Sequence, residues 1–596
     1  MRGRVRLHTA FVLLLSGLFW RTDPVRAQRL ATPPAAEVDM QWGVKVPMRD
    51  GVSLNATVLR PHGQKEALPV VFTLTPYIAD SYLDRATYFA QHGYVYALVD
   101  VRGRGNSGGT FAPFENDARD GYDIVEWFAK QPWCDGKVAM WGGSYAGFDQ
   151  WATLKEFPPH LATIVPAAAA HAGVDFPYDS NVASLYLMQW LSFTSGVTGN
   201  AKLFGEESFW GSKWRDIYRN HLPFNQLDVL VGNPSATFHK WLAHPTPDAF
   251  FDSLAPSQED YKKIHIPILT ITGSYDGDQA GAMTYYRRHM EYGTNEAKAR
   301  HYLVIGPWDH AGTRTPNRDV GGLKFGEASL VDLNKLHLDW YDWTMKSGAR
   351  PGFLEKRVMY YVMAEDKWKS ADTLEGAAND KLKLALGSAG TAADVFQSGW
   401  LSAETRAGSN ADHFVYDPLD TRPGEKELFS DPAYLTSQRE ALNVMGRGVV
   451  YHSAPLERDT EVTGYAKLRV WLSMDVPDTD LLASISEIRE DGGLVALTGA
   501  VMRARYRHSL RAAELVPLNK PELYEFQNFM WFSRRLQKGS RIRLLLECPN
   551  SIQLEKNYNS GGDVAAESGK DAKTANVTVL HDPEHRSELE LPIAKP

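Results

Sequence analysis

Short apolar runs alternate with helical patterns along roughly the first 350 residues of this 596-residue chain. The runs are rich in Val, Ile, Leu and Tyr, and they cover residues 68–74, 94–101, 138–142, 161–168, 266–272 and 302–305. Residues 117–130 and 330–345 instead repeat apolar side chains at the spacing of one helix face. Because buried strands that alternate with helices form parallel sheets covered on both faces, the pattern predicts an α/β fold.

Two long segments depart from this alternation. Residues 172–262 are rich in aromatic side chains, and they separate the predicted strands 161–168 and 266–272. An insertion there should lie over the carboxyl ends of the strands, where ligands bind in open α/β sheets, so we expect a helical cap. After residue 351 short extended runs follow one another between turn residues, which predicts a separate β-sandwich over 352–596. The α/β domain then comprises residues 38–171 and 263–351.

The N-terminus has the pattern of a secretory signal peptide. Arg2, Arg4 and Arg6 form a basic head, residues 9–20 are apolar, and small residues at Val25 and Ala27 precede the expected cleavage site. A transmembrane anchor is the alternative, but a span needs about 20 apolar residues, which this run does not reach. We therefore expect residues 1–27 to be removed, a secreted or periplasmic protein, and no membrane span after cleavage.

Charge and cysteine content narrow the possible partners. The formal net charge of −8 argues against nucleic acid and against anionic lipid as partners. Cys134 and Cys548 are the only two cysteines of the chain, so they form no disulfide framework, and we take both as free packing residues. No Cys/His cluster suggests a metal, and no cofactor is expected. The sequence leaves the oligomeric state open, a homo-oligomer included.

The central motif runs from Gly142 to Gly147, directly after a predicted strand and before a helical stretch. In the sequence Gly-Gly-Ser-Tyr-Ala-Gly, Ser144 has the position of the nucleophile on the sharp strand–turn–helix elbow of α/β-hydrolases. The usual motif has glycine two positions after the serine, where this chain has Ala146. A plain structural turn is the alternative. Whether the motif marks a nucleophile therefore depends on finding an acid and a histidine that could act with Ser144.

Two candidate partners follow later strands in the order that this fold requires. Asp276 comes just after the strand 266–272, and His310 comes just after the strand 302–305. Carboxyl ends of parallel strands share one edge of a sheet, so Ser144, Asp276 and His310 should meet there as nucleophile, acid and base. Asp278 is a rival for the acid, and Asp276 could be a turn residue. Other histidines, such as His171 and His301, we take as structural.

A glycine-rich loop could be mistaken for a nucleotide site. Residues 103–108 satisfy the pattern G-x-G-x-x-G after a strand. A dinucleotide site would begin its helix inside the motif and in the first strand–helix unit, whereas here the helical pattern begins only near Asp117. We interpret the stretch as a tight structural loop beside the site.

The motifs together resemble the cocaine esterase/X-Pro dipeptidyl-peptidase (CocE/NonD) hydrolases. The matching stretches are 75–77, 100–109, 133–136, 142–147, 275–277 and 306–310. The family also places the elbow glycine three residues after the serine, so Gly147 is a match. The resemblance further implies a C-terminal jelly roll and an oxyanion hole formed by the Tyr145 N–H and the Tyr77 hydroxyl. A buried tyrosine with a structural hydrogen bond is the alternative for Tyr77.

The same resemblance bears on the substrate. Asp278 and Asp179 resemble parts of the carboxylate cluster that binds the α-ammonium group in α-amino acid ester hydrolases, although the next position of that cluster is Gln279 here. Two solvated aspartates are the plainer interpretation.

The predicted activity is therefore cleavage of a small ester, amide or short peptide through an acyl-enzyme. X-Pro dipeptidyl-peptidase and α-amino acid ester or β-lactam acylase activities are alternatives. A non-catalytic carbohydrate-binding protein is the alternative from another class.

Overall fold

The computed structural model describes residues 37–404, 410–439, 442–443 and 445–595. The signal peptide expected over residues 1–27 lies outside these residues. In the part of the chain that is described, no helix is both long enough and apolar enough to cross a membrane.

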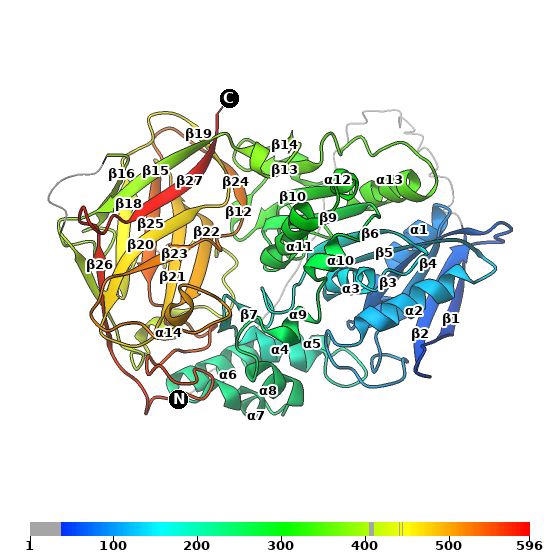
Figure 1. The fold of residues 1–596 in the computed structure, drawn as a ribbon, viewed down its shortest axis with the longest axis horizontal. Helices are drawn as coiled ribbons and strands as arrows, with labels where there is room; N and C mark the ends of the chain where they lie inside the picture. The colour runs from blue at the N-terminus through cyan, green and yellow to red at the C-terminus, as the bar shows by residue number, and fades with distance from the viewer. Residues whose placement is uncertain (1–36, 405–409, 440–441, 444, 596) are drawn as a thin grey trace, which may run out of the picture. The chain divides into compact units, whose positions relative to one another are not determined.

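The first sheet forms the scaffold of the α/β domain. Its strands are β1 (Val38–Pro47), β2 (Ser53–Pro61), β3 (Leu68–Thr75), β4 (Val95–Asp100), β5 (Cys134–Ser144), β6 (Leu161–Ala169), β9 (Ile268–Tyr275), β10 (His301–Asp309), β13 (Val358–Val362) and β14 (Lys367–Ala371). They are ordered β1-β2-β4-β3-β5-β6-β9-β10-β13-β14 (Figure 1). The strands from β4 to β13 in this order run parallel, and β1, β2 and β14 pair antiparallel at the edges. Each apolar run that predicted a strand forms one, with ends shifted by a few residues.

Helices cover both faces of this sheet, as a parallel sheet requires. They are α1 (Leu83–Gln91) and α13 (Leu333–Met345) on one face, and α2 (Asp117–Ala129), α3 (Tyr145–Leu154) and α11 (Gln279–Tyr292) on the other. Successive side chains of β3 alternate between the faces: Val70 and Phe72 pack in the cluster that contains Phe128, whereas Val71 packs in the cluster that contains Trp340. Burial on both faces explains the continuous apolar runs of the sequence.

The boundary expected at residue 351 does not coincide with the end of the first sheet. The β-sandwich expected over 352–596 includes the extended run at 358–363, but Val358 pairs in parallel with Leu303 of β10, and β14 follows in the same sheet. An extended run does not reveal its partner strand, and here the partner lies more than 50 residues earlier. The sandwich begins only with the next strand.

The C-terminal domain is a β-sandwich around a large apolar cluster, to which Tyr361 of β13 and Met363 also contribute. Its strands are β15 (Asp380–Gly387), β16 (Gly399–Ser402), β17 (Asp412–Tyr416), β18 (Gly448–Ser453), β19 (Thr460–Gly464), β20 (Lys467–Met474), β21 (Asp480–Ile488), β22 (Leu494–Arg503), β23 (Glu522–Phe526), β24 (Phe532–Leu536), β25 (Arg541–Glu547), β26 (Ala575–Leu580) and β27 (Glu588–Ala594). Pairing is antiparallel except between β16 and β18. Figure 1 shows these strands in yellow-green to red.

The segment between β6 and β9 forms the cap. Its elements are β7 (Tyr178–Asp179), β8 (Val182–Ala183), α4 (Tyr186–Phe193), α5 (Ala201–Phe204), α6 (Glu207–Arg219), α7 (Leu227–Leu230), α8 (Ala236–Leu242), α9 (Ala249–Asp252) and α10 (Gln258–Tyr261). Trp190, Trp214 and Trp241 of the cap share one apolar cluster with Tyr145 and Phe148 of α3. The aromatic side chains therefore fix the cap to the first turns of the helix that follows the elbow.

Short elements complete the described chain. They are α12 (Asn295–Ala299), β11 (Asp319–Val320), β12 (Leu323–Lys324) and α14 (Arg422–Lys426).

Candidate active site

The turn between β5 and α3 has the geometry of a nucleophile elbow. Ser144 has φ 65° and ψ −127°, a left-handed backbone that costs a serine about 1–3 kcal/mol. A Cβ atom on Gly142 would lie 2.5 Å from that of Ala146, and one on Gly147 would lie 2.8 Å from a backbone atom of β6. Both glycines are therefore needed for the close approach of strand and helix, while Ala146 fits at its own position.

His310 and Asp276 meet at the ends of neighbouring strands. The His310 Nδ1 atom lies 2.8 Å from Oδ1 of Asp276 and 3.9 Å from Oδ2 of Asp278. The Thr272 hydroxyl donates to Asp276 Oδ2 at 2.8 Å, and the Asp278 N–H donates to Oδ1 at 3.0 Å. Burial raises the pKa of Asp276, but these hydrogen bonds and the His310 ring outweigh it, so the pKa stays below its usual value. Asp276, rather than Asp278, is thus the carboxylate within hydrogen-bond distance of the imidazole.

Ser144 and His310 line one cavity of about 630 Å³. The Ser144 hydroxyl lies 3.4 Å from the Tyr77 hydroxyl. Among the hydrogen bonds of the described residues, none joins the Ser144 hydroxyl directly to the His310 ring. The hydroxyl and the imidazole must therefore approach each other more closely before proton transfer. Such contacts often tighten only in complexes with substrate.

The protonation of His310 depends on two neighbouring carboxylates. Burial lowers the pKa of His310, but the negative charges of Asp278 and Asp276 outweigh burial and raise the pKa above its usual value. Burial also raises the pKa of Asp278 to about 6, against the opposing effects of His310 and of the Ser144 hydroxyl. The imidazole and Asp278 therefore influence each other's charge in the range where a histidine base works.

Two hydrogen-bond donors face Ser144 from opposite elements. The Tyr145 N–H opens α3, where helix geometry leaves it without an intrahelical acceptor. The Tyr77 hydroxyl accepts a hydrogen bond of 3.1 Å from the Trp190 indole N–H, so its own proton stays free to donate toward Ser144. Burial raises the pKa of Tyr77 to about 12, which keeps the phenol protonated at neutral pH. Its ring also stacks on Phe193 at 5.6 Å.

One wall of the cavity carries three carboxylates. Asp278 and the two cap residues Asp175 and Asp179 line it. Asp175 accepts hydrogen bonds only from backbone N–H groups, those of His171 at 2.8 Å and Gly281 at 2.5 Å, within the described contacts. Burial raises the pKa of both cap carboxyl groups, although Asp179 is exposed and Asp175 half-buried as whole residues. Burial thus favours the protonated forms of these carboxyl groups, whereas a cation bound beside them would favour the charged forms.

The sequence did not single out Asp175 as a site residue, because no motif surrounds it in the aromatic cap. Gln279 occupies the position where the carboxylate cluster of α-amino acid ester hydrolases has its next carboxylate. Its side chain does not line the cavity. Its side-chain amide donates to Gly273 O at 2.9 Å and to Trp531 O at 2.8 Å, and it accepts from the Trp531 N–H. Gln279 thus joins the α/β domain to the C-terminal domain instead of facing a ligand.

The C-terminal domain supplies the apolar wall of the same cavity. Leu482 of β21, residues 499–501 of β22 and Leu554 line it. Leu554 also forms a β-bridge with Ser184 of the cap. The sequence around these residues has the same pattern as that of other strands. It therefore did not reveal that they form a wall of the cavity.

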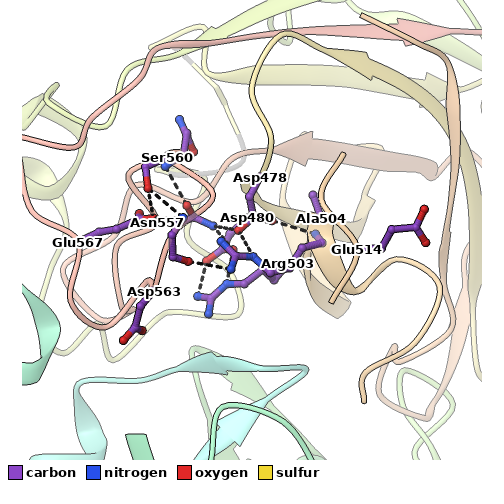
Figure 2. A network of polar contacts seen from close by, with 12 residues as sticks. Asp478, Asp480, Arg503, Ala504, Glu514, Asn557, Ser560, Asp563 and Glu567 are labelled. Atoms are coloured by element: carbon purple, nitrogen blue, oxygen red, sulfur yellow. Dashed lines mark hydrogen bonds and ion pairs between the residues drawn. The ribbon is translucent and has the colours of Figure 1, made fainter. Parts of the chain in front are cut away.

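A buried ionic network involves residues close in sequence to this apolar wall, and Figure 2 shows its polar contacts. Arg503, at the end of β22, donates to both oxygens of Asp480 at 2.8 and 3.0 Å and to Glu555 at 2.8 Å. The Asn557 amide donates to Asp478 and Asp480 at 2.8 and 3.0 Å. Because these residues lie one to four positions from Leu482, Val501 and Leu554, the network fixes the wall in place.

The remaining candidates lie apart from the cavity. His301 is buried between His289 and Thr270, and His171 contacts Ala172 O. Cys134 and Cys548 are both free and buried, as expected. Within residues 37–404 and the later described ranges, no group of three or more His, Cys, Asp or Glu side chains could hold a metal ion.

Comparisons with known proteins agree with this architecture. Residues 50–312 match the X-Pro dipeptidyl-peptidase (S15 family), and residues 351–590 match the X-Pro dipeptidyl-peptidase C-terminal non-catalytic domain. Over 588 residues the chain is 27% identical to cocaine esterase of Rhodococcus sp. (strain MB1 Bresler), a match that covers 93% of this chain and 98% of the esterase.

Two solved structures share the fold. An α-amino acid ester hydrolase superposes with a TM-score of 0.80 at 20% identity, covering 96% of this chain and 100% of the other. An aminopeptidase from the marine sediment archaeon Thaumarchaeota archaeon gives 0.79 at 20% identity, with 96% and 99% covered. The fold is thus that of the α/β-hydrolases with a C-terminal β domain.

The matched relatives hydrolyse ester or peptide bonds, which makes a non-catalytic binding protein the poorer interpretation.

Proposed function

Because the chain belongs to the CocE/NonD family of serine hydrolases, we propose that it cleaves carboxylic ester bonds with Ser144 as nucleophile, His310 as base and Asp276 as orienting acid. The observation that carries the proposal is the hydrogen bond of 2.8 Å between His310 and Asp276 at the cavity that Ser144 lines. A serine on a strained elbow beside an oriented imidazole has the arrangement of an activated nucleophile.

The reaction begins when the ester carbonyl binds above Ser144. His310 Nε2 accepts the hydroxyl proton while Oγ forms a bond to the carbonyl carbon, and Asp276 stabilises the imidazolium that results. The tetrahedral intermediate then breaks the bond to the alcohol, which leaves with the proton held by His310. Water attacks the acyl-enzyme with the same base, and Ser144 regains its proton as the acid departs.

The oxyanion of each tetrahedral intermediate lies between the Tyr145 N–H and the Tyr77 hydroxyl. Both donors are fixed before substrate arrives, Tyr145 by the helix and Tyr77 by Trp190 and Phe193. Fixed donors in a cavity closed by protein stabilise developing charge without reorganisation, and removing one lowers kcat by about 10²–10³-fold in serine hydrolases.

A second candidate activity follows from the three carboxylates of the cavity wall. Asp175, Asp179 and Asp278 would attract a protonated amine on the acyl group through Coulomb interaction. Esters of α-amino acids and dipeptides with a free N-terminus both carry such a group. The apolar wall from the C-terminal domain would receive the hydrocarbon part.

A substrate panel separates these activities. The purified protein should be assayed with p-nitrophenyl butyrate, an α-amino acid methyl ester and Gly-Pro p-nitroanilide, each with Ser144→Ala as control. Hydrolysis of the two esters, absent in the variant, is the expected result. Turnover of the anilide alone would show that the protein is a dipeptidyl-peptidase and would contradict the ester proposal.

We also propose export of the protein, which the basic head and apolar run of residues 1–27 support. Mass determination of the protein secreted by an expressing bacterium should give a chain that begins at residue 28. A chain that retains residues 1–27 would contradict export by cleavage.

A further inference from the structure

The glycine-rich loop after β4 lies directly beside the oxyanion donor Tyr77. Gly103 and Gly105 have φ of 75° and 53°. A Cβ atom on Gly103 would lie 2.2 Å from the Phe111 nitrogen, and one on Gly105 would lie 2.1 Å from an Asp100 oxygen. The glycines therefore allow a loop so tight that the side chain between them, Arg104, turns inward.

Arg104 is fully buried, and backbone carbonyls surround its guanidinium. The Nε atom donates to Pro76 O at 2.9 Å. The Nη1 atom donates to Thr194 O at 2.7 Å and contacts the carbonyls of Ser195, Gly196 and Thr198. The loop itself adds a bond of 2.6 Å from the Gly105 N–H to Val197 O. One buried cation thus joins the end of β3 to the loop that follows α4.

Both ends of this connection lead to Tyr77. Pro76 directly precedes Tyr77 in the chain. Thr194 directly follows Phe193, the last residue of α4, whose ring stacks on Tyr77. The Thr194 hydroxyl donates to Trp190 O at 3.0 Å, and the Trp190 indole donates to the Tyr77 hydroxyl.

We infer that Arg104 is a positioning residue that fixes the Tyr77 hydroxyl at the oxyanion site by joining Pro76 to the 194–198 loop of the cap. The inference rests on the proposed function, because it concerns the same acyl transfer at Ser144. The glycine-rich stretch 103–108 would then support catalysis through Arg104 and would not bind a nucleotide.

The geometry requires arginine. A planar guanidinium presents several N–H donors in fixed directions, so it reaches Pro76 and the cap carbonyls at the same time. A lysine ammonium is a single point at the end of a flexible stem and cannot hold both sides in this way. Loss of the connection should therefore let Tyr77 move without removing the hydroxyl itself.

A double-mutant cycle tests the inference with p-nitrophenyl butyrate. Tyr77→Phe alone should lower kcat by about 10²–10³-fold, as expected for one lost oxyanion donor. Arg104→Met should lower kcat by about 10- to 100-fold, because it displaces the same donor. In the Tyr77→Phe background, Arg104→Met should lower kcat by less than about threefold, since residues that act through one contact are not additive.

Arg102→Met is the matched control. Arg102 lies on the same loop but binds Asp120 and Asp50 instead of the cap, at 2.5 and 2.9 Å. This variant should lose thermal stability while its kcat stays within about twofold of the wild type, as for a residue outside the site. If Arg104→Met does not fold, Arg104→Lys takes its place in the same cycle.

The outcomes separate the inference from the proposed function. Equal losses of kcat from the Arg104 variant in both backgrounds would overturn the inference alone, as would an unchanged kcat. If Tyr77→Phe keeps the kcat of the wild type, the oxyanion role of Tyr77 is wrong, and the inference falls with it.

Discussion

At the scale of single residues, the surroundings of each side chain determine its protonation. Burial beside Trp190 keeps the Tyr77 phenol protonated, whereas two carboxylates raise the pKa of His310 despite its burial. The base must be neutral to accept the proton of Ser144. The activity is therefore expected to fall as the pH decreases through the pKa of His310.

Asp278→Asn should move the acidic limb of the profile of kcat/KM to lower pH. The substitution removes a negative charge that raises the pKa of His310, so the imidazole stays neutral at lower pH. Asp339→Asn, on the outer part of α13 where Asp339 pairs with Lys335, should leave the limb in place. If the acidic limb of the kcat/KM profile does not move in the Asp278 variant, a group other than His310 beside Asp278 determines that limb.

Single residues were predictable from the sequence only where a strand places them. Ser144 ends a parallel strand, and Asp276 and His310 each directly follow one, so their common edge could be inferred. Asp175 and Trp190 belong to the cap, whose short helices have weak periodicity and no fixed relation to the sheet. Their contribution to the site required the folded structure.

At the scale of elements, the elbow depends on how closely α3 approaches the sheet. The glycine three positions after Ser144 faces the backbone of β6, and no side chain fits between them. The sequence predicted this strand, turn and helix because their residue types are local. It did not predict that β13 extends the first sheet, because the choice between two partner strands is not local.

Gly147→Ala should destabilise the protein although alanine favours helices. The new Cβ atom would lie 2.8 Å from a backbone atom of β6, and overpacking of this kind costs about 1–3 kcal/mol. Gly352→Ala is the control, because no atom lies within 4 Å of the Cβ atom that it adds. Thermal unfolding followed by circular dichroism measures both. Equal melting temperatures for the two variants would contradict the close contact.

At the scale of the whole molecule, the cavity is formed by three parts of the chain. The α/β domain supplies the reacting groups, the cap supplies Asp175 and Trp190, and the C-terminal domain supplies Leu482 and Val501. The sequence indicated an α/β domain, a cap and a C-terminal domain. It did not indicate that the C-terminal domain lines the same cavity as Ser144. Contacts between domains depend on surfaces that only folding creates.

Arg503→Met should weaken the connection between the C-terminal domain and the cavity. The substitution leaves Asp480 and Glu555 buried without their cation, which costs about 3–5 kcal/mol. Arg469→Met removes an exposed pair with Glu525 and should cost no more than about 1 kcal/mol. Urea unfolding measures both losses, and the KM for a bulky ester should rise only in the Arg503 variant. Similar losses in the two variants would contradict a supporting role for the buried network.

The most direct test of the account is the site of covalent labelling by a fluorophosphonate. The reagent forms a stable bond with an activated serine, and peptide mass mapping locates it. We predict one adduct on Ser144, none in Ser144→Ala, and much slower labelling in His310→Ala, in which Tyr77 and Tyr145 are unchanged. An adduct on another serine, or no adduct on protein that still hydrolyses p-nitrophenyl butyrate, would contradict the assignment of Ser144 as nucleophile.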